Sequence, residues 1–197
     1  MPTGVHIRDA RQQLFEAAER ILVRDGANAL TSRAVTAEAG VAKGVLHRHF
    51  TDFDAFLAEL VHDRVARLGD QAATLRASAG TGTVTGNLTA ALLDLFDPVA
   101  VGIVGLIIFR SELRARLRTT SPGIPVLADA GAMIAGYLTR ERELGRIAAD
   151  ADIDSLALSL IGAGHLLFAG ATDRPDAAAV GKMVDTITAD VVQRRLL

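Results

Sequence analysis

The sequence predicts an all-α protein of about nine helices, because apolar residues recur at the helical spacing in one segment after another. We find no segment with the strict alternation of apolar and polar residues, closed by hairpin turns, that predicts β-strands. Short clusters of Gly, Pro, Ser and Asp separate the periodic segments and mark the ends of helices. The chain has 197 residues, half of them hydrophobic, which is enough to bury a core.

The breaks between periodic segments give the expected helices in order. The first ends near Asp25-Gly26, because Gly26 accepts the left-handed backbone conformation that closes a helix. The pair Thr31-Ser32 provides N-cap candidates for the second, and Thr51 or Asp52 for the fourth. The expected helices cover residues 7–25, 31–39, 43–49, 52–77, 84–96, 99–118, 124–145 and 155–170, and a last helix follows Asp176.

Charge is distributed unevenly along the chain. Residues 1–50 contain seven Lys or Arg and five acids, a net charge of +2. Residues 51–197 contain fourteen Lys or Arg and eighteen acids, a net charge of −4. A mildly basic N-terminal segment on an acidic body suits a protein that contacts nucleic acid through one end only. We therefore expect a domain boundary near residue 50.

Residues 31–50 have the pattern of two short helices joined by a tight turn. Leu46 and its apolar neighbours can hold the two helices at a steep angle, and Gly40 supplies the backbone freedom of the turn. The remaining side chains are mostly polar, basic or very small, which suits the major groove of DNA. Lys43 can reach a phosphate or a guanine there, and Val45 a thymine methyl. The predicted DNA-contacting residues are Thr31, Ser32, Arg33, Thr36, Ala42, Lys43, Gly44, Val45, His47, Arg48 and His49. The alternative is two ordinary packing helices of a larger bundle.

The turn and second helix contain the motif Ala39-Gly40-Val41-x-Lys43-Gly44-x-Leu46-x-x-x-Phe50. This motif resembles the recognition segment of the tetracycline-repressor (TetR) family of transcriptional regulators. The resemblance covers roughly residues 10–60, and the chain length and the later helices agree with it. Two positions differ from the usual family pattern: His47 stands where Tyr is common, and Phe53 where a basic residue often lies.

The resemblance implies a three-helix helix-turn-helix DNA-binding domain at residues 1–50. It also implies a helical effector-binding and dimerisation domain at residues 51–197. A protein of this kind is a regulator rather than an enzyme. It usually acts as a repressor on a palindromic operator in double-stranded DNA, as a homodimer, and a small apolar effector releases it.

The C-terminal helices are expected to bind a second copy. Residues 155–171 contain only one ionisable side chain, that of His165, and several glycines that suggest close approach of helices. The resemblance implies that the last two helices, within residues 153–196, form a four-helix bundle with the partner. A membrane segment is the alternative, but the stretch is short for a span and has acidic flanks. The predicted interface residues are Leu160, Gly164, Val180, Val184, Ile187 and Val191.

An effector pocket is expected among the helices of the second domain. The apolar run Val99–Phe109 leads into Arg110, and a buried Arg110 would favour an acidic or carbonyl-bearing ligand. His165 lies in an apolar helix and either faces the pocket or is a hydrogen-bonded core residue. The candidates for the lining are His62, Phe109, Arg110, Met133, Tyr137, His165 and Phe168. For each apolar residue the alternative is an ordinary core position, and for Arg110 it is a solvated pair with Glu112.

Several classes of chemistry find no support in the sequence. The chain has no cysteine, which excludes disulfides, thiol nucleophiles and Cys-based zinc sites. It lacks the H-E-x-x-H, phosphate-loop and G-x-S-x-G motifs, and the aspartates at 150, 152 and 154 lack the Gly and Glu of a calcium loop. We therefore expect no cofactor and no metal. Residues 1–11 lack the apolar core of a secretory signal, which fits a cytoplasmic protein. The remaining alternative is a helical small-molecule-binding protein or enzyme without a DNA function.

Overall fold

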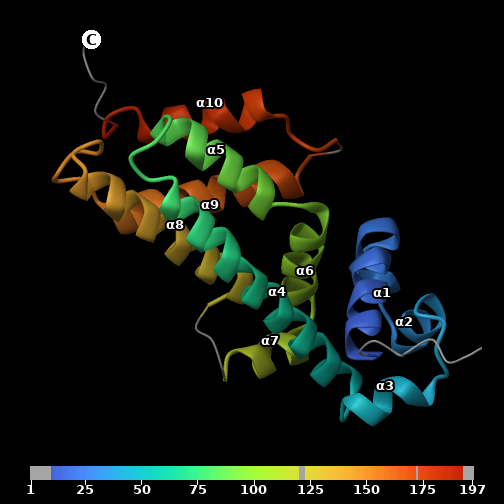
Figure 1. Ribbon diagram of the computed structural model, residues 1–197. Helices are drawn as coiled ribbons and strands as arrows, with labels where there is room; N and C mark the ends of the chain where they lie inside the picture. Colours follow the sequence, from blue (N-terminus) through green and yellow to red (C-terminus); the bar gives the residue numbers. More distant parts are fainter. Residues whose placement is uncertain (1–9, 120–122, 172, 193–197) are drawn as a thin grey trace, which may run out of the picture. The chain divides into compact units, whose positions relative to one another are not determined.

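The computed structural model describes residues 10–119, 123–171 and 173–192. Within these ranges the chain forms ten α-helices, one 3-10 helix (Ala27–Ala29) and no strand beyond a single isolated bridge (Figure 1). The predicted all-α fold is therefore confirmed. The α-helices are α1 (Ala10–Asp25), α2 (Ser32–Glu38), α3 (Gly44–His49), α4 (Phe53–Ala77), α5 (Val84–Leu95), α6 (Pro98–Phe109), α7 (Ser111–Leu117), α8 (Pro125–Glu143), α9 (Ile153–Ala169) and α10 (Ala177–Thr188).

The chain forms two compact units that do not divide at residue 50. Unit 1 consists of Met1–Asp63 and Gly102–Pro122, and unit 2 of Arg64–Val101 and Gly123–Leu197. Helices α4 and α6 each contribute residues to both units. Helix α7 and most of α6 therefore fold with the N-terminal helices, although they lie far away in the sequence. The division by function, with DNA binding before residue 50 and ligand binding after it, stays a prediction.

An aromatic cluster forms the core of unit 1. Phe56 of α4 is fully buried, and its ring centroid lies 5.6 Å from that of Phe15 in α1 and 5.1 Å from that of Phe50. Phe53 stacks on Phe56 with the centroids 5.6 Å apart. Aromatic pairs at these separations add attraction to the burial of their large apolar area. The cluster therefore fixes the end of α3 and the start of α4 against α1.

Arg110 breaks the helix that the sequence predicted over residues 99–118. Its backbone is extended, with φ −105° and ψ 104°, so α6 ends before it and α7 begins after it. Its Nη2 donates to the Leu30 carbonyl at 3.0 Å, its Nη1 lies 3.7 Å from Asp54 Oδ1, and its Cζ lies 5.5 Å from the Phe53 ring centroid. Helical spacing continues on both sides of this residue, so the periodicity could not reveal the break. The break accounts for ten α-helices in place of about nine.

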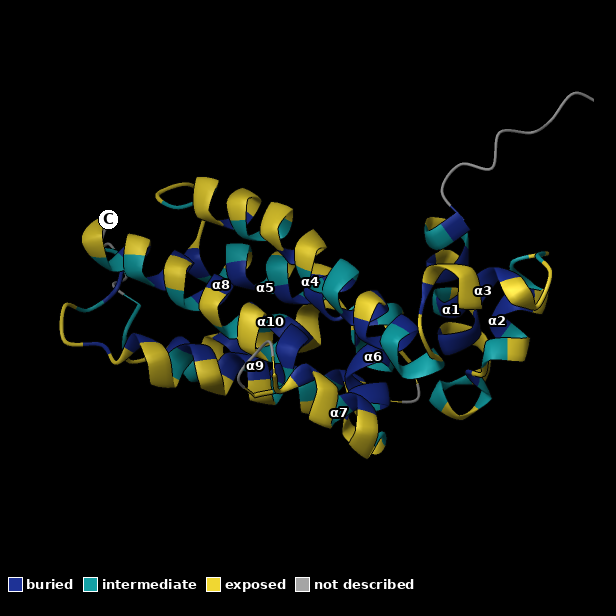
Figure 2. Cartoon of the chain, turned by 90° about the horizontal axis from the view of Figure 1, so that it is seen from below, coloured by how far each residue is buried: buried dark blue, intermediate teal, exposed yellow. Residues whose placement is uncertain are grey.

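Unit 2 is built around α5, α8, α9 and α10. Helix α10 packs against α5 and α9, and α8 packs against α9. Figure 2 shows that these helices have both buried and exposed faces. No single helix in the described ranges is long and apolar enough to cross a membrane, although α5 and α6 pass that test together as a bent pair.

A buried polar network ties α8 to the loop after α4. Glu141 is fully buried, and its Oε1 accepts the hydroxyl proton of Tyr137 at 2.6 Å. The Gly80 N–H donates to both Glu141 oxygens at 3.3 Å, and Arg146 Nε lies 3.4 Å from Oε2. Asn87 Nδ2 donates to the Tyr137 oxygen at 3.0 Å. Burial, and then the hydrogen bond to Glu141, raise the pKa of Tyr137 well above its usual value.

Candidate nucleic-acid interface

Helices α2 and α3 form the two-helix motif that the sequence predicted. Thr31 caps α2, since its Oγ1 accepts a backbone N–H three residues later at 3.1 Å. Gly40 has a φ of 66°, in the left-handed region. The Gly40 N–H donates to the Ala37 carbonyl at 3.1 Å and the Val41 N–H to the Thr36 carbonyl at 3.0 Å. These two bonds close the end of α2 around a left-handed glycine, which turns the chain sharply into α3.

Two arginines of α1 hold the end of α2. Arg20 Nε donates to Glu38 Oε1 at 2.9 Å, and Arg24 Nη1 donates to Glu38 Oε2 at 3.0 Å. The hydrogen bond from Arg20, and then that from Arg24, lower the pKa of the Glu38 carboxyl. These ion pairs between α1 and α2 were not predicted from the sequence. The four-residue spacing of the two arginines, one helical turn, is the signal that could have indicated a shared partner.

Most of the predicted DNA-contacting side chains are accessible to solvent. Ser32 is half-buried, and the exposed ones are Thr31, Arg33, Ala42, Lys43, Gly44, His47, Arg48 and His49. Two predictions need correction. Val45 is only 8% exposed and packs in the core, so it is not free to contact a thymine methyl. Thr36 is only 2% exposed, and its hydroxyl donates to the Ser32 carbonyl at 3.0 Å, so it serves the packing of α2.

A shallow concavity of about 440 Å³ lies between α2 and the start of α3. Its lining residues are Ser32, Arg33, Thr36, Lys43, Gly44 and His47. Arg33 and Lys43 supply positive charge, and none of the six lining residues is acidic. Such a surface is complementary to the phosphates along a groove of DNA.

The predicted effector-binding residues are divided between the two units. Phe109 is 82% exposed, and Arg110 is held in unit 1 by Leu30 and Asp54, so neither lines a pocket of unit 2. The acidic ligand that we expected from a buried Arg110 therefore loses its basis. Met133 does line a pocket, of about 290 Å³.

Three of the remaining candidates lie in unit 2, away from Met133's pocket lining. Tyr137 is buried in the Glu141 network. His165 and Phe168 lie beside Phe96, with ring centroids 6.2 Å and 5.3 Å from its ring. The Nδ1 of His165 is buried without a hydrogen-bond partner among the described residues, and burial lowers the pKa of this imidazole. His62 is half-buried and belongs to unit 1. Within the described ranges no group of three or more His, Asp or Glu is placed to hold a metal ion.

The predicted dimer residues are largely covered by their own chain. Leu160, Val180 and Val184 are fully buried, and a Cβ on Gly164 would lie 2.6 Å from the Phe96 ring. Ile187 and Val191 are half-buried. The apolar stripe of α10 faces α5 and α9 of the same chain, so Leu160, Gly164, Val180 and Val184 need a correction: they are core positions. The predicted role of Ile187 and Val191 in the dimer interface stays a prediction. Periodicity identifies a buried face but not which chain buries it.

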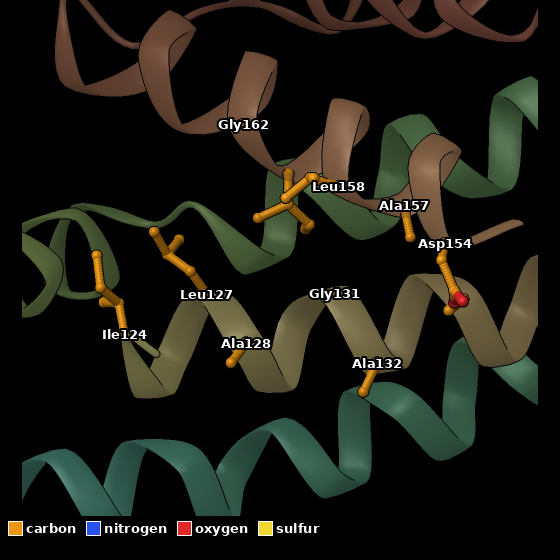
Figure 3. A pocket seen from close by; sticks show the side chains of 11 residues that line it. Ile124, Leu127, Ala128, Gly131, Ala132, Asp154, Ala157, Leu158 and Gly162 are labelled. Atoms are coloured by element: carbon orange, nitrogen blue, oxygen red, sulfur yellow. The ribbon is translucent and has the colours of Figure 1, made fainter. Parts of the chain in front are cut away.

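Other residues of α9 form the exposed apolar surface of unit 2. Leu158 and Leu166 are 74% and 73% exposed, and Gly162 lies between them on the same face of the helix. Leu158 and Gly162 also border a shallow groove between α8 and α9, of about 420 Å³ (Figure 3). Its lining is apolar except for Asp154.

A two-helix motif with an exposed basic second helix, supported by α1, is typical of a helix-turn-helix DNA-binding domain. Comparison with known families agrees, because residues 14–60 match the family model of bacterial regulatory proteins of the tetR family. The matched residues include all of α2 and α3. Residues 14–60 are therefore similar to the DNA-binding segment of tetR-family regulators.

Individual relatives support the same assignment. An uncharacterized HTH-type transcriptional regulator of Haemophilus influenzae is 33% identical over 54 residues, which are 27% of this chain and 29% of that protein. A TetR-family regulator of Mesorhizobium loti has a similar structure, with a TM-score of 0.66 and 16% identity over 93% of this chain and 96% of its own. SmeT, the repressor of the Stenotrophomonas maltophilia multidrug efflux pump SmeDEF, also has a similar structure. Its TM-score is 0.64 and its identity 18%, over 96% of this chain and 94% of its own. At these identities the structural likeness shows the fold.

Proposed function

We propose that this protein is a transcriptional repressor that binds a palindromic operator as a homodimer and leaves it when a small molecule binds unit 2. The observation that carries the proposal is the exposed, basic surface of α3 beside the concavity lined by Arg33 and Lys43. The match of residues 14–60 to the tetR family model supports the proposal, and a DNA-binding regulator of this kind acts in the cytoplasm. Ligand control is supported by two proteins of similar fold, SmeT in complex with triclosan and the multidrug binding protein EbrR in complex with imidazole.

Selection of bound DNA from a random pool tests the function directly. The full chain is expected to enrich one palindromic sequence, because a symmetric dimer presents two copies of α3 to two half-sites. A gel shift then measures the affinity for that sequence at fixed salt, since phosphate contacts make affinity depend strongly on salt. A protein that enriches no sequence would instead favour the alternative of a small-molecule-binding protein without a DNA function.

Replacing Lys43 with Ala is expected to weaken operator binding about 10- to 100-fold, the usual loss for one base or phosphate contact. Adding His47→Ala should bring binding near the level of non-specific DNA. Both side chains are exposed, so the thermal stability should not change. Lys182→Ala, which removes an exposed lysine of α10, is the matched control and should bind like the unmodified protein. Unchanged affinity of the double variant would refute the assignment of α3.

The dimer is proposed to form through the exposed face of α9 that contains Leu158, Gly162 and Leu166. An apolar face of this kind is usually covered in solution, and a symmetric partner can cover it with the same residues. A glycine between the two leucines allows a second helix to approach closely. Helix α4 has residues in both units, so it is the proposed route by which a ligand in unit 2 changes DNA affinity.

Replacing Leu158 and Leu166 together with Asp is expected to convert the dimer into a monomer, because two charges cannot be desolvated in an apolar interface. Sedimentation velocity measures the change in mass. Val23→Asp is the control, since Val23 is 51% exposed on α1 and lies outside this face. A double variant that remains dimeric would place the interface elsewhere.

A further inference from the structure

The pocket that contains Met133 lies between α4, α5 and α8 of unit 2. Leu75, Ala91 and Met133 give it an apolar lining, and Leu75 and Met133 are buried. Its volume of about 290 Å³ suits a small organic molecule. The polar groups around this lining determine what kind of molecule can bind.

Most of the hydrogen-bond donors of the lining are already used within the chain, the amide N–H groups of Gln71 excepted. The hydroxyl of Thr74 donates to the Asp70 carbonyl at 2.9 Å, and that of Ser78 to the Leu75 carbonyl at 2.7 Å. The side-chain amide of Asn87 donates to Ser78, Thr81 and Tyr137 oxygens at 3.0–3.2 Å. A ligand that needs donors from the protein therefore finds few in this pocket.

The unused polar groups of the lining are the side-chain amide of Gln71 and two carboxylates. Gln71 Oε1 is buried and has no hydrogen-bond partner in the part of the chain that the structure describes. The exposed carboxylates of Asp70 and Asp94 lie at the rim, and within the described ranges neither is paired with a cation. No Lys, Arg or His lines the pocket. The site thus offers an apolar lining, one buried acceptor and two negative charges.

We propose that this pocket binds small apolar molecules that contain a protonated amine. The apolar part lies against Leu75 and Met133, the ammonium N–H groups donate to Gln71 Oε1, and Asp70 and Asp94 attract the positive charge. A buried acceptor without a donor is unfavourable, so a ligand that supplies the donor is preferred over one that cannot. An anionic ligand is disfavoured, because the lining holds no positive charge to compensate it. The inference rests on the proposed function in one respect, namely that this ligand is the effector.

Three probes of nearly equal size and different charge test the ligand class. Phenylbutylamine, phenylbutanol and phenylbutanoate are titrated into the full chain by calorimetry, without DNA. The amine is expected to bind about tenfold more tightly than the alcohol, because the ammonium group adds charge pairs with Asp70 and Asp94 and a hydrogen bond to Gln71. The carboxylate is expected to show no binding. Equal binding of the three probes, or tighter binding of the carboxylate, would overturn the inference.

Variants of the lining place the bound amine in this pocket. Asp70→Asn with Asp94→Asn should weaken amine binding about tenfold, and Gln71→Leu by a similar factor. Ala90 lines the pocket but is exposed, so Ala90→Phe should fill the mouth and abolish binding without disturbing the core. Asp185→Asn, on the exposed side of α10, is the control and should bind the amine normally. Normal binding by Ala90→Phe would refute the location.

A gel shift with and without the amine separates this inference from the proposed function. If the protein binds its operator but no amine, the proposed function stands and the ligand class is wrong. If the amine binds in the pocket and operator affinity is unchanged, the ligand class stands and the role of this pocket in regulation is refuted.

Discussion

Replacing Phe56 with Ala is expected to destabilise unit 1 by about 3–5 kcal/mol and to abolish DNA binding. Phe56 is fully buried, and the rings of Phe15, Phe50 and Phe53 lie 5.1–5.6 Å from its centroid. Removing the ring leaves a cavity among three other large side chains, which cannot all move to fill it. Because the cluster fixes the end of α3, its loss should also release this helix, which we propose contacts DNA, from its position.

Urea denaturation measures the loss of stability of the Phe56→Ala variant, and a gel shift measures operator binding. Phe109→Ala is a matched control, because it removes the same side chain from a position that is 82% exposed. The control is expected to stay within about 0.5 kcal/mol of the unmodified protein. Equal stability of the two variants would mean that the aromatic cluster does not hold unit 1 together.

The helix-turn-helix could be predicted from sequence because its determinants are local. The left-handed turn requires Gly40, and Thr31 caps α2. Leu46 provides the apolar contact between the two short helices. Each of these lies within a few residues of the feature that it specifies. The exposed basic residues of α3 follow from the same pattern, since the apolar face must point inward.

Other features of the structure depend on contacts that the spacing of residues in the sequence does not reveal. The break at Arg110 is stabilised by Leu30, eighty residues away in the chain. The sequence predicted a contact between Val45 and DNA because Val45 lies in the second helix of the motif. Its position in the helical turn instead directs its side chain into the core. The apolar stripe of α10 was correctly recognised as a buried face, yet α5 and α9 of the same chain cover it.

The ligand pocket was harder to predict for the same reason. Asp70, Gln71 and Asp94 are ordinary polar residues of two amphipathic helices, and only packing brings them to one opening. The sequence instead indicated Arg110 as a ligand-binding residue, because it follows a long apolar run, but the partners of Arg110 lie in unit 1. The expected ligand changes accordingly from an acid to a cation.

Replacing Glu141 with Leu is expected to destabilise unit 2 by about 3–5 kcal/mol, the usual cost of removing one partner of a buried polar network. Glu141 is fully buried and accepts hydrogen bonds from Tyr137 and Gly80. Leucine has a similar size but no acceptor, so the buried Tyr137 hydroxyl and the Gly80 N–H lose their partner. Denaturant unfolding measures the loss. Glu143→Leu is the control on the same helix, since Glu143 is exposed and pairs with Arg140 at 2.8 Å. Its cost should not exceed about 1 kcal/mol.

The sole tyrosine of the chain makes the same network visible by absorbance. Burial and the hydrogen bond to Glu141 raise the pKa of Tyr137 in the folded state, so folding favours the neutral phenol. The corresponding stabilisation is complete below pH of about 10, the pKa of an unfolded tyrosine, and is lost as pH rises above it. The folded protein should therefore keep Tyr137 neutral at a pH where the tyrosine of the unfolded chain ionises.

In the Glu141→Leu variant the Tyr137 phenol should ionise at lower pH than in the unmodified protein, because the hydrogen bond to Glu141 is gone. If the ionisation of Tyr137 were the same in both proteins, and the two glutamate variants equally stable, the network would have no part in holding α8 to the loop after α4.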